Sequence, residues 1–349
     1  MSRRVGVIGA IAGVVAAGGV GAVAVNRTVA RRRQVDIDPF LNQPYDRNGR
    51  VCADDGVSLY YEEIGRVDAP LTVIMVHGFC LRLGEFYFQR RDLVARFGDD
   101  VRFVLYDQRS HGRSESSPSD ADSIDQLGRD LLAIIDALAP SGPITLIGHS
   151  MGGMTIMALA DAEPQLFDSK SARIVGVGLV STSTGKIASA TLGLPAALAR
   201  LKGPILPLLL RGARSQVALV ERGRAIGSDL AWAITRRISF GPGPVDPAVL
   251  EYLSTMLAST RIDVIADFYQ TLLDHEKLGA LKVLTGLPAV IICGDADVMT
   301  PIEHSRAIAE ALPDAKFVAV PGGGHVVLME FPDQVTEPLA GLIEASRPA

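Results

Sequence analysis

Six short runs of apolar residues, separated by longer amphipathic segments, constrain the fold of this 349-residue chain more than any other feature. Runs of this kind are typical of strands that are covered on both faces of a sheet. The segments between them include residues 123–138, where apolar side chains recur every three or four positions, as on one face of a helix. The alternation predicts an α/β fold, with a mostly parallel central sheet and helices on both faces. The runs are LTVIMV (71–76), VRFVLY (101–106), ITLI (144–147), IVGVGLV (174–180), AVIIC (289–293) and KFVAV (316–320).

The alternation stops after the fourth run, for about a hundred residues that lack a clear strand and are rich in Leu, Ala, Arg and Gly. Asp246 followed by Pro247 marks a helix start within this stretch, because Asp caps helices and Pro suits their first turn. We therefore expect residues 181–286 to form an inserted helical lid. The core of the α/β fold would then consist of residues 48–180 and 287–349.

The segment that precedes the core has the composition of a connector. Residues 34–47 contain Pro39 and Pro44 and follow no apolar period, so we expect a linker there. The core itself should open with a hairpin, because Asp54-Asp55-Gly56 lies between two strand-like runs.

Residues 5–25, VGVIGAIAGVVAAGGVGAVAV, contain no charged side chain and are numerous enough to cross a bilayer as a helix. The mean hydropathy of the chain, +0.26, is high for a purely soluble protein. Residues 1–33 therefore read as an N-terminal hydrophobic anchor with basic flanks, which would bind membrane lipid through residues 5–25. The distribution of arginines favours a cytoplasmic location for the chain beyond the anchor. The alternative is a signal peptide cleaved after Ala22-Val23-Ala24, which would give a secreted protein.

Charge and cysteine content exclude other classes of protein. Six of the 34 basic residues lie within residues 1–33, whereas all 39 acidic residues lie beyond them. This acidic body is unsuited to general nucleic-acid binding. Cys52, Cys80 and Cys293 are too widely spaced for a disulfide framework or a metal site, and we expect no metal and no organic cofactor.

Ser150 occupies a strand-to-helix junction in the stretch LIGHSMGGM, residues 146–154. Glycines two positions to either side, Gly148 and Gly152, give the G-x-S-x-G pattern of a sharp turn that exposes a nucleophilic serine. A serine hydroxyl needs a base to accept its proton and a third group to orient that base.

The base and the acid are expected after the serine, in the order Ser, Asp or Glu, His. His325 follows a strand-like run in KFVAVPGGGH, on a glycine-rich loop that lets its imidazole reach the strand ends. Asp295 and Asp297 follow the strand AVIIC, and we take Asp297 as the acid because it lies further along the turn. The backbone N–H groups of Phe79, after the strand ending at His77-Gly78, and of Met151, after the serine, are the predicted oxyanion hole.

The chain resembles the α/β-hydrolase superfamily over residues 48–346, in the esterase- and lipase-like branch with a serine nucleophile and a helical cap. The resemblance implies that Ser150, Asp297 and His325 are nucleophile, acid and base. Ser110 departs from the family pattern, because it replaces the first glycine of D-x-R-G-x-G-x-S in a structural turn. The matching motifs are HGF (77–79), DQRSHGRS (107–114), GHSMGG (148–153), GDADVMTP (294–301) and GGGH (322–325).

The pattern predicts a serine hydrolase that cleaves small-molecule or lipid-like carboxylic esters or thioesters through an acyl-enzyme on Ser150. A C–C bond hydrolase, a perhydrolase and an acyltransferase use the same triad and are alternatives. A catalytically silent ligand-binding module of the same fold is the alternative outside enzymes. Fold alone does not select the substrate, and the sequence leaves the oligomeric state open.

Overall fold

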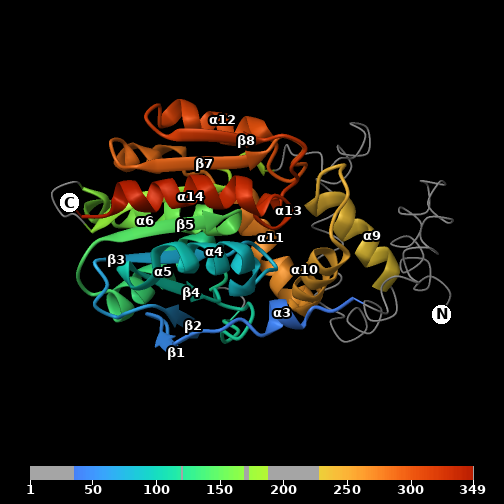
Figure 1. Cartoon of the computed structure of the whole chain (residues 1–349), viewed down its shortest axis with the longest axis horizontal. Helices are drawn as coiled ribbons and strands as arrows, with labels where there is room; N and C mark the ends of the chain where they lie inside the picture. The colour runs from blue at the N-terminus through green and yellow to red at the C-terminus, as the bar shows by residue number, and fades with distance from the viewer. Residues whose placement is uncertain (1–34, 119–120, 169–172, 188–227, 349) are drawn as a thin grey trace.

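The computed structural model describes residues 35–118, 121–168, 173–187 and 228–348 (Figure 1). Eight strands of the described residues form one sheet in the order β1-β2-β4-β3-β5-β6-β7-β8. β1 and β2 pair antiparallel as the predicted hairpin, β2 is antiparallel to β4, and the remaining neighbours are parallel. The strands are β1 (Arg47–Cys52), β2 (Ser58–Ile64), β3 (Leu71–Val76), β4 (Val101–Tyr106), β5 (Ile144–His149), β6 (Ile174–Val180), β7 (Ala289–Gly294) and β8 (Lys316–Val320).

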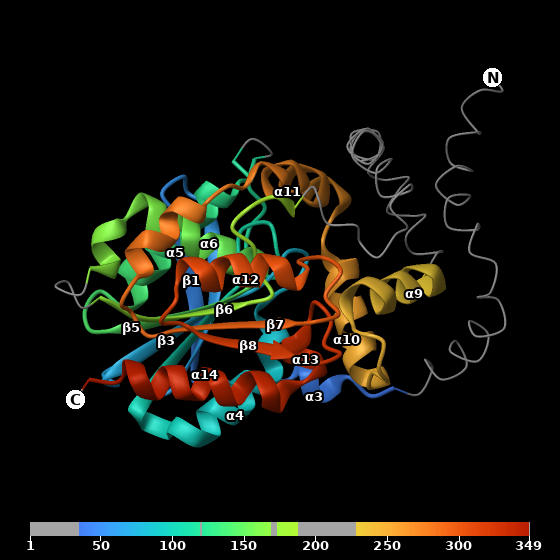
Figure 2. The same ribbon diagram turned by 90° about the horizontal axis from the view of Figure 1, so that it is seen from above.

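The six apolar runs of the sequence become β3 to β8, because helices cover the sheet on both faces (Figure 2). Along β3, Val73 and Met75 pack into the core beneath α4 (Tyr87–Phe97) and α14 (Pro332–Ser346). Ile74 and Val76 face the opposite core, which is covered by α5 (Ile124–Leu138), α6 (Met151–Ala162) and α12 (Ile302–Ala311). This confirms the predicted α/β fold class.

Shorter helices and the lid helices complete the described part of the chain. They are α3 (Asp38–Leu41), η1 (Leu83–Phe86), η2 (Gly98–Asp100), η3 (Pro164–Phe167), α9 (Ser228–Ser239), α10 (Pro247–Ser259), α11 (Ile262–Asp274), η5 (Leu278–Leu284) and α13 (Val327–Glu330).

Within the expected lid, α10 begins where the sequence predicts a helix. The Asp246 side chain accepts a hydrogen bond from the Ala248 N–H at 2.8 Å, which caps the helix start. Phe268 and Leu272 of α11 pack in one apolar cluster with Met151 and Met154 of α6. The lid therefore rests on the helix that follows Ser150. The part of the lid at 188–227 lies outside the described residues.

The segment predicted as a linker, residues 34–47, carries structure of its own. It contains the one-turn helix α3, in which Pro39 suits the first turn. The buried Phe40 ring packs between Tyr87 of α4, with 4.4 Å between ring centroids, and Tyr252 of α10, at 5.0 Å. This segment thus joins the core to a lid helix.

The predicted anchor lies outside the described residues. Among those that are described, no helix is both long and apolar enough to cross a membrane.

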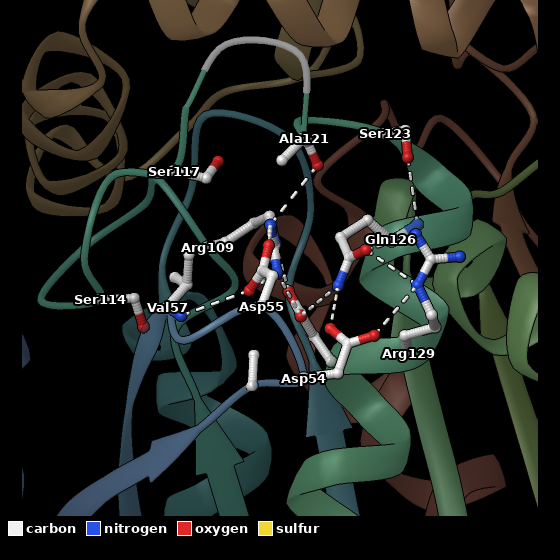
Figure 3. Close-up of polar contacts among 12 residues, drawn as sticks. Asp54, Asp55, Val57, Arg109, Ser114, Ser117, Ala121, Ser123, Gln126 and Arg129 are labelled. Carbon is white, nitrogen blue, oxygen red and sulfur yellow. Dashed lines mark hydrogen bonds and ion pairs between the residues drawn. The ribbon is translucent and has the colours of Figure 1, made fainter.

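A buried ion-pair cluster fastens the β1–β2 hairpin to the body of the sheet (Figure 3). The fully buried Arg109, in the loop after β4, donates two hydrogen bonds of 2.6 Å to Asp130 of α5. It also contacts both carboxylate oxygens of Asp55 in the hairpin turn, at 2.7 and 3.1 Å. Next to it, Ser110 has a φ of 62°, a left-handed conformation that suits the glycine usual at this position of the motif.

Candidate active site

Ser150 lies on a sharp turn between β5 and α6, at the carboxyl edge of the parallel strands. Its φ of 50° and ψ of −117° are rarely adopted by residues other than glycine. The turn is crowded: a Cβ on Gly148 would come within 2.5 Å of the Gly152 backbone, and a Cβ on Gly152 would overlap the Val76 carbonyl. The two glycines of the predicted motif are therefore required by packing.

The structure brings the three predicted triad residues together. Ser150 Oγ lies 2.9 Å from His325 Nε2, and His325 Nδ1 lies 2.9 Å from Asp297 Oδ2. Because a carboxylate only accepts, Nδ1 carries the proton of a neutral His325, which leaves Nε2 to accept the serine proton. Asp297 follows β7 and His325 follows β8, so the three side chains come from three strand ends.

Asp297 is held as an ionised acceptor. Burial raises its pKa, but the nearby His325 and hydrogen bonds from His325 and Thr300 outweigh burial, and the pKa is lowered overall. Its Oδ1 accepts from the N–H groups of Met299 at 2.7 Å and Thr300 at 3.0 Å. Asp295 is exposed instead, and its carboxylate accepts from the Gly322 N–H at 2.6 Å, as a residue of the turn.

The two predicted oxyanion residues approach the serine from different parts of the chain, since Met151 follows Ser150 directly and Phe79 belongs to the loop after β3. Met151 is the first residue of α6, so its N–H has no partner within the helix. Phe79 belongs to the loop after β3, where a Cβ placed on Gly78 would lie 3.3 Å from Ser150 Cβ. The loop that carries the Phe79 N–H therefore passes directly beside the serine.

Comparison with known proteins agrees with this geometry. A model of the family described as "Alpha/beta hydrolase family" matches residues 73–337, which is most of the chain. The chain belongs to the alpha/beta hydrolase family. The match includes all five of the predicted site residues.

Relatives of this alpha/beta hydrolase include enzymes of several kinds. A bifunctional esterase/perhydrolase of Acinetobacter calcoaceticus is 26% identical over 281 residues, covering 79% of this chain and 92% of that relative. The dihydrolipoyllysine-residue acetyltransferase component of an acetoin cleaving system in Pseudomonas putida is 26% identical over 290 residues. That match covers 81% of this chain and 66% of the relative, so this chain spans just under two thirds of its length.

Among solved structures, a thermophilic esterase from Thermogutta terrifontis has a similar fold, with a TM-score of 0.65 and 23% identity. The alignment covers 87% of this chain and all of the esterase. The match to the family and the esterase/perhydrolase relative support hydrolase activity.

A second buried acid–histidine pair lies behind the triad of the alpha/beta hydrolase, and sequence reasoning missed it. Glu85 of η1 accepts a hydrogen bond from the Gly78 N–H at 3.1 Å and contacts His149 Nδ1 at 3.2 Å. His149 Nε2 lies 3.1 Å from the His325 carbonyl, which only accepts, so Nε2 carries a proton. Burial lowers the pKa of His149, but the Glu85 carboxyl at Nδ1 outweighs it and raises that pKa overall, which favours a proton between the two groups.

Burial acts on both partners of this pair. It raises the pKa of the Glu85 carboxyl, and the neighbouring His149 counteracts this. The pair links the loop after β3, which carries the predicted oxyanion residue Phe79, to the backbone of His325. A signal exists in the sequence, because Glu85 is the only acidic residue between Asp68 and Asp92 and sits among apolar and basic side chains.

Two other histidines of the alpha/beta hydrolase hold loops in place. His77 Nε2 accepts from the Gln108 N–H at 2.8 Å, and burial lowers the pKa of His77 to about 4. His111 Nε2 accepts from the Cys80 N–H at 3.1 Å, and burial lowers the pKa of His111 to about 3. Both rings stay neutral at pH 7, and the contact to Cys80 holds the loop after β3 in place.

Proposed function

We propose that this protein is a serine hydrolase that cleaves carboxylic esters or thioesters through an acyl-enzyme on Ser150. The observation that carries the proposal is the continuous series of contacts from Ser150 Oγ through the His325 ring to Asp297, each 2.9 Å long. A hydroxyl with this base and this orienting acid is the arrangement that acyl transfer requires.

In the proposed reaction, Ser150 Oγ attacks the carbonyl carbon while its proton passes to His325 Nε2. Asp297 stabilises the resulting imidazolium. The N–H groups of Phe79 and Met151 receive the negative charge that develops on the carbonyl oxygen. His325 then protonates the leaving alcohol or thiol, and a water activated by the same ring releases the acid from Ser150.

The choice of an ester or thioester rests on the relatives and on the lid. The Acinetobacter calcoaceticus relative is named as an esterase/perhydrolase, which uses acyl chemistry. The apolar side chains of α11 that pack beside Met151 favour an acyl or other apolar group in the substrate. The acetyltransferase name of the Pseudomonas putida relative makes acyl transfer to another acceptor the competing outcome.

The proposal is tested with a panel of p-nitrophenyl esters of increasing acyl length and with a fluorophosphonate probe that labels activated serines. The unmodified protein should hydrolyse at least one ester and take up the probe. Ser150→Ala should abolish labelling and lower kcat by several orders of magnitude, leaving only binding and oxyanion stabilisation.

The matched control is Ser116→Ala, because Ser116 is an exposed serine in the loop after β4. It should keep full activity and labelling. Retention of more than about a tenth of the activity by Ser150→Ala would exclude Ser150 as the nucleophile. A folded protein that neither hydrolyses esters nor binds the probe would support the ligand-binding alternative.

We also propose that residues 5–25 hold this hydrolase at a membrane. Their 21 uncharged residues would span about 31 Å as a helix, close to the thickness of the hydrocarbon core. Arginines on both sides suit anionic headgroups.

A further inference from the structure

A cavity of about 450 Å³ lies between α3, η1, α10 and the end of β4. Its volume is in the range that small-molecule sites occupy. None of the five predicted active-site residues lines it. One wall is the segment 40–45, which the sequence indicates only as a linker, and another is Tyr252 of the lid helix α10. The cavity is therefore a separate site from the one beside Ser150.

The side chains around the cavity carry one more positive than negative charge. Arg90 pairs with Glu62 at 2.6 Å, and Arg113 contacts the same carboxylate at 3.2 Å. The Asp107 carboxylate accepts the backbone N–H groups of Leu83 at 2.8 Å and Arg113 at 2.7 Å. With Arg82, which also lines the cavity, three arginines thus face the two carboxylates of Glu62 and Asp107.

Arg82 faces the cavity beside Asp107, where burial raises the pKa of the carboxyl and the positive charge of Arg82 partly counteracts this. Within the described part of the chain it makes no ion pair, and its guanidinium lies over the Tyr252 ring, 5.7 Å from the centroid. The Arg82 guanidinium also forms a side-chain hydrogen bond with Tyr252, and its planar fork has further N–H groups that can donate to a planar anion. This geometry suits a carboxylate.

Two further polar atoms at the cavity lack partners among the described residues. Arg90 is 3% exposed, yet its Nε–H donates to no acceptor, although its terminal nitrogens are paired. The Gln43 side-chain oxygen is also buried without a donor. A buried donor without a partner costs free energy unless a ligand or water satisfies it. Both residues line the cavity.

Apart from Asn42, the rest of the lining is apolar or aromatic. Phe40 and Leu83 are buried side chains that contribute carbon surface, and the Tyr252 ring stacks on Phe40. An inorganic anion would leave this surface unused, whereas an organic acid would cover it.

We propose that this cavity binds a small organic monocarboxylate, with the carboxylate at Arg82 and the apolar part against Phe40 and Leu83. The site is distinct from the proposed hydrolytic centre and does not depend on it. η1 forms the wall at Leu83 and Gly84 and continues directly to Glu85, so the ligand would lie next to the helix that contacts the oxyanion loop.

The experiment is isothermal titration of the full chain at pH 7.5 with benzoate and hexanoate, and with the uncharged amides of the same size. We expect at least one acid to bind at least tenfold more tightly than its amide, because only the acid satisfies Arg82. Arg82→Ala should weaken binding of that acid at least tenfold. Arg91→Ala is the matched control, because Arg91 is an exposed arginine of α4 outside the cavity, and it should bind like the unmodified chain.

A second arm separates this site from the active site. Protein treated with the fluorophosphonate probe should bind the acid as before, and loss of binding would assign the acid to the region of Ser150. If the probe labels nothing, the proposed hydrolase function fails, but the titrations still show whether the cavity binds the acid. The two proposals therefore fail separately.

Three results would overturn the proposal. They are no measurable binding of either acid, equal binding of acid and amide, and inorganic phosphate displacing the acid at equal concentration. The comparison of acid with amide uses the unmodified chain, so it stands even if Arg82→Ala does not fold.

Discussion

Asp295 and Asp297 are separated by a single residue and have the same side chain, but their environments differ. Asp297 is buried against His325, and Asp295 is exposed and bound to the Gly322 backbone. Asp297→Asn should lower kcat by roughly 10⁴-fold at neutral pH, because an amide favours the wrong tautomer of His325. Asp295→Asn should change kcat by less than about threefold, because its carboxylate binds only the backbone N–H of Gly322 in a turn. Steady-state kinetics on one ester, with the reverse ranking as the contradicting result, decides between them.

His111 should make stability depend on pH. The unfolded chain takes up a proton at His111 near pH 6.5, whereas the folded protein resists protonation until about pH 3 because the ring is buried. The unfolded state therefore binds more protons between these values, and acidification favours unfolding. Between pH 6.5 and 5 this single group should remove about 2 kcal/mol of unfolding free energy.

The test compares urea denaturation of the unmodified protein and His111→Asn at both pH values. The variant should be less stable at pH 6.5, because the Cys80 N–H loses its acceptor. Its disadvantage should shrink by about 2 kcal/mol at pH 5. A constant difference would mean that His111 titrates alike in both states.

The buried Arg109 cluster holds three elements together, because it joins the β1–β2 hairpin, the loop after β4 and α5. Asp130→Asn leaves the buried guanidinium short of a counter-charge and should lower the unfolding free energy by about 3–5 kcal/mol. Asp68→Asn is the control, because the Arg66–Asp68 pair is fully exposed to solvent and its loss should leave the unfolding free energy nearly unchanged. Denaturant titrations followed by circular dichroism measure both, and equal effects would contradict the structural role of the buried cluster.

Strand positions were predictable because burial on both faces requires continuous apolar residues. β3, β4 and β6 therefore have the bounds of their sequence runs. β8 also has the bounds of its run, although as an edge strand it is largely exposed. The positions of the serine, the acid and the histidine could also be predicted from the sequence, since each follows a strand. The pairing of Glu85 with His149 was not, because the two residues are 64 positions apart and only the fold brings them together.

Helix α3 was missed for a different reason. A single turn has too few residues for an apolar period, and such a short helix is marginal without tertiary contacts. Its stability comes from Phe40, whose partners Tyr87 and Tyr252 lie far along the chain. The sequence around α3 therefore does not indicate which distant residues pack against it.

For the whole molecule, the sequence predicts attachment to a membrane through residues 5–25. The full-length protein should sediment with membranes and resist extraction by high salt, because apolar burial is insensitive to charge screening. Cell fractionation with a salt wash and a detergent wash measures this. Recovery of the protein from the medium with Val25 at its N-terminus would establish the signal-peptide alternative.

The packing of α3 also decides where the chain can be cut to prepare the folded body alone. Sequence composition suggests a soluble, fully active fragment that begins near Asp46. Such a fragment would lack Phe40, expose the faces of Tyr87 and Tyr252 to water, and remove the bond between the Pro44 carbonyl and Arg90. It should aggregate more readily than a fragment that begins at residue 35. Purification trials, and any search for crystals or inhibitors, should therefore start upstream of α3.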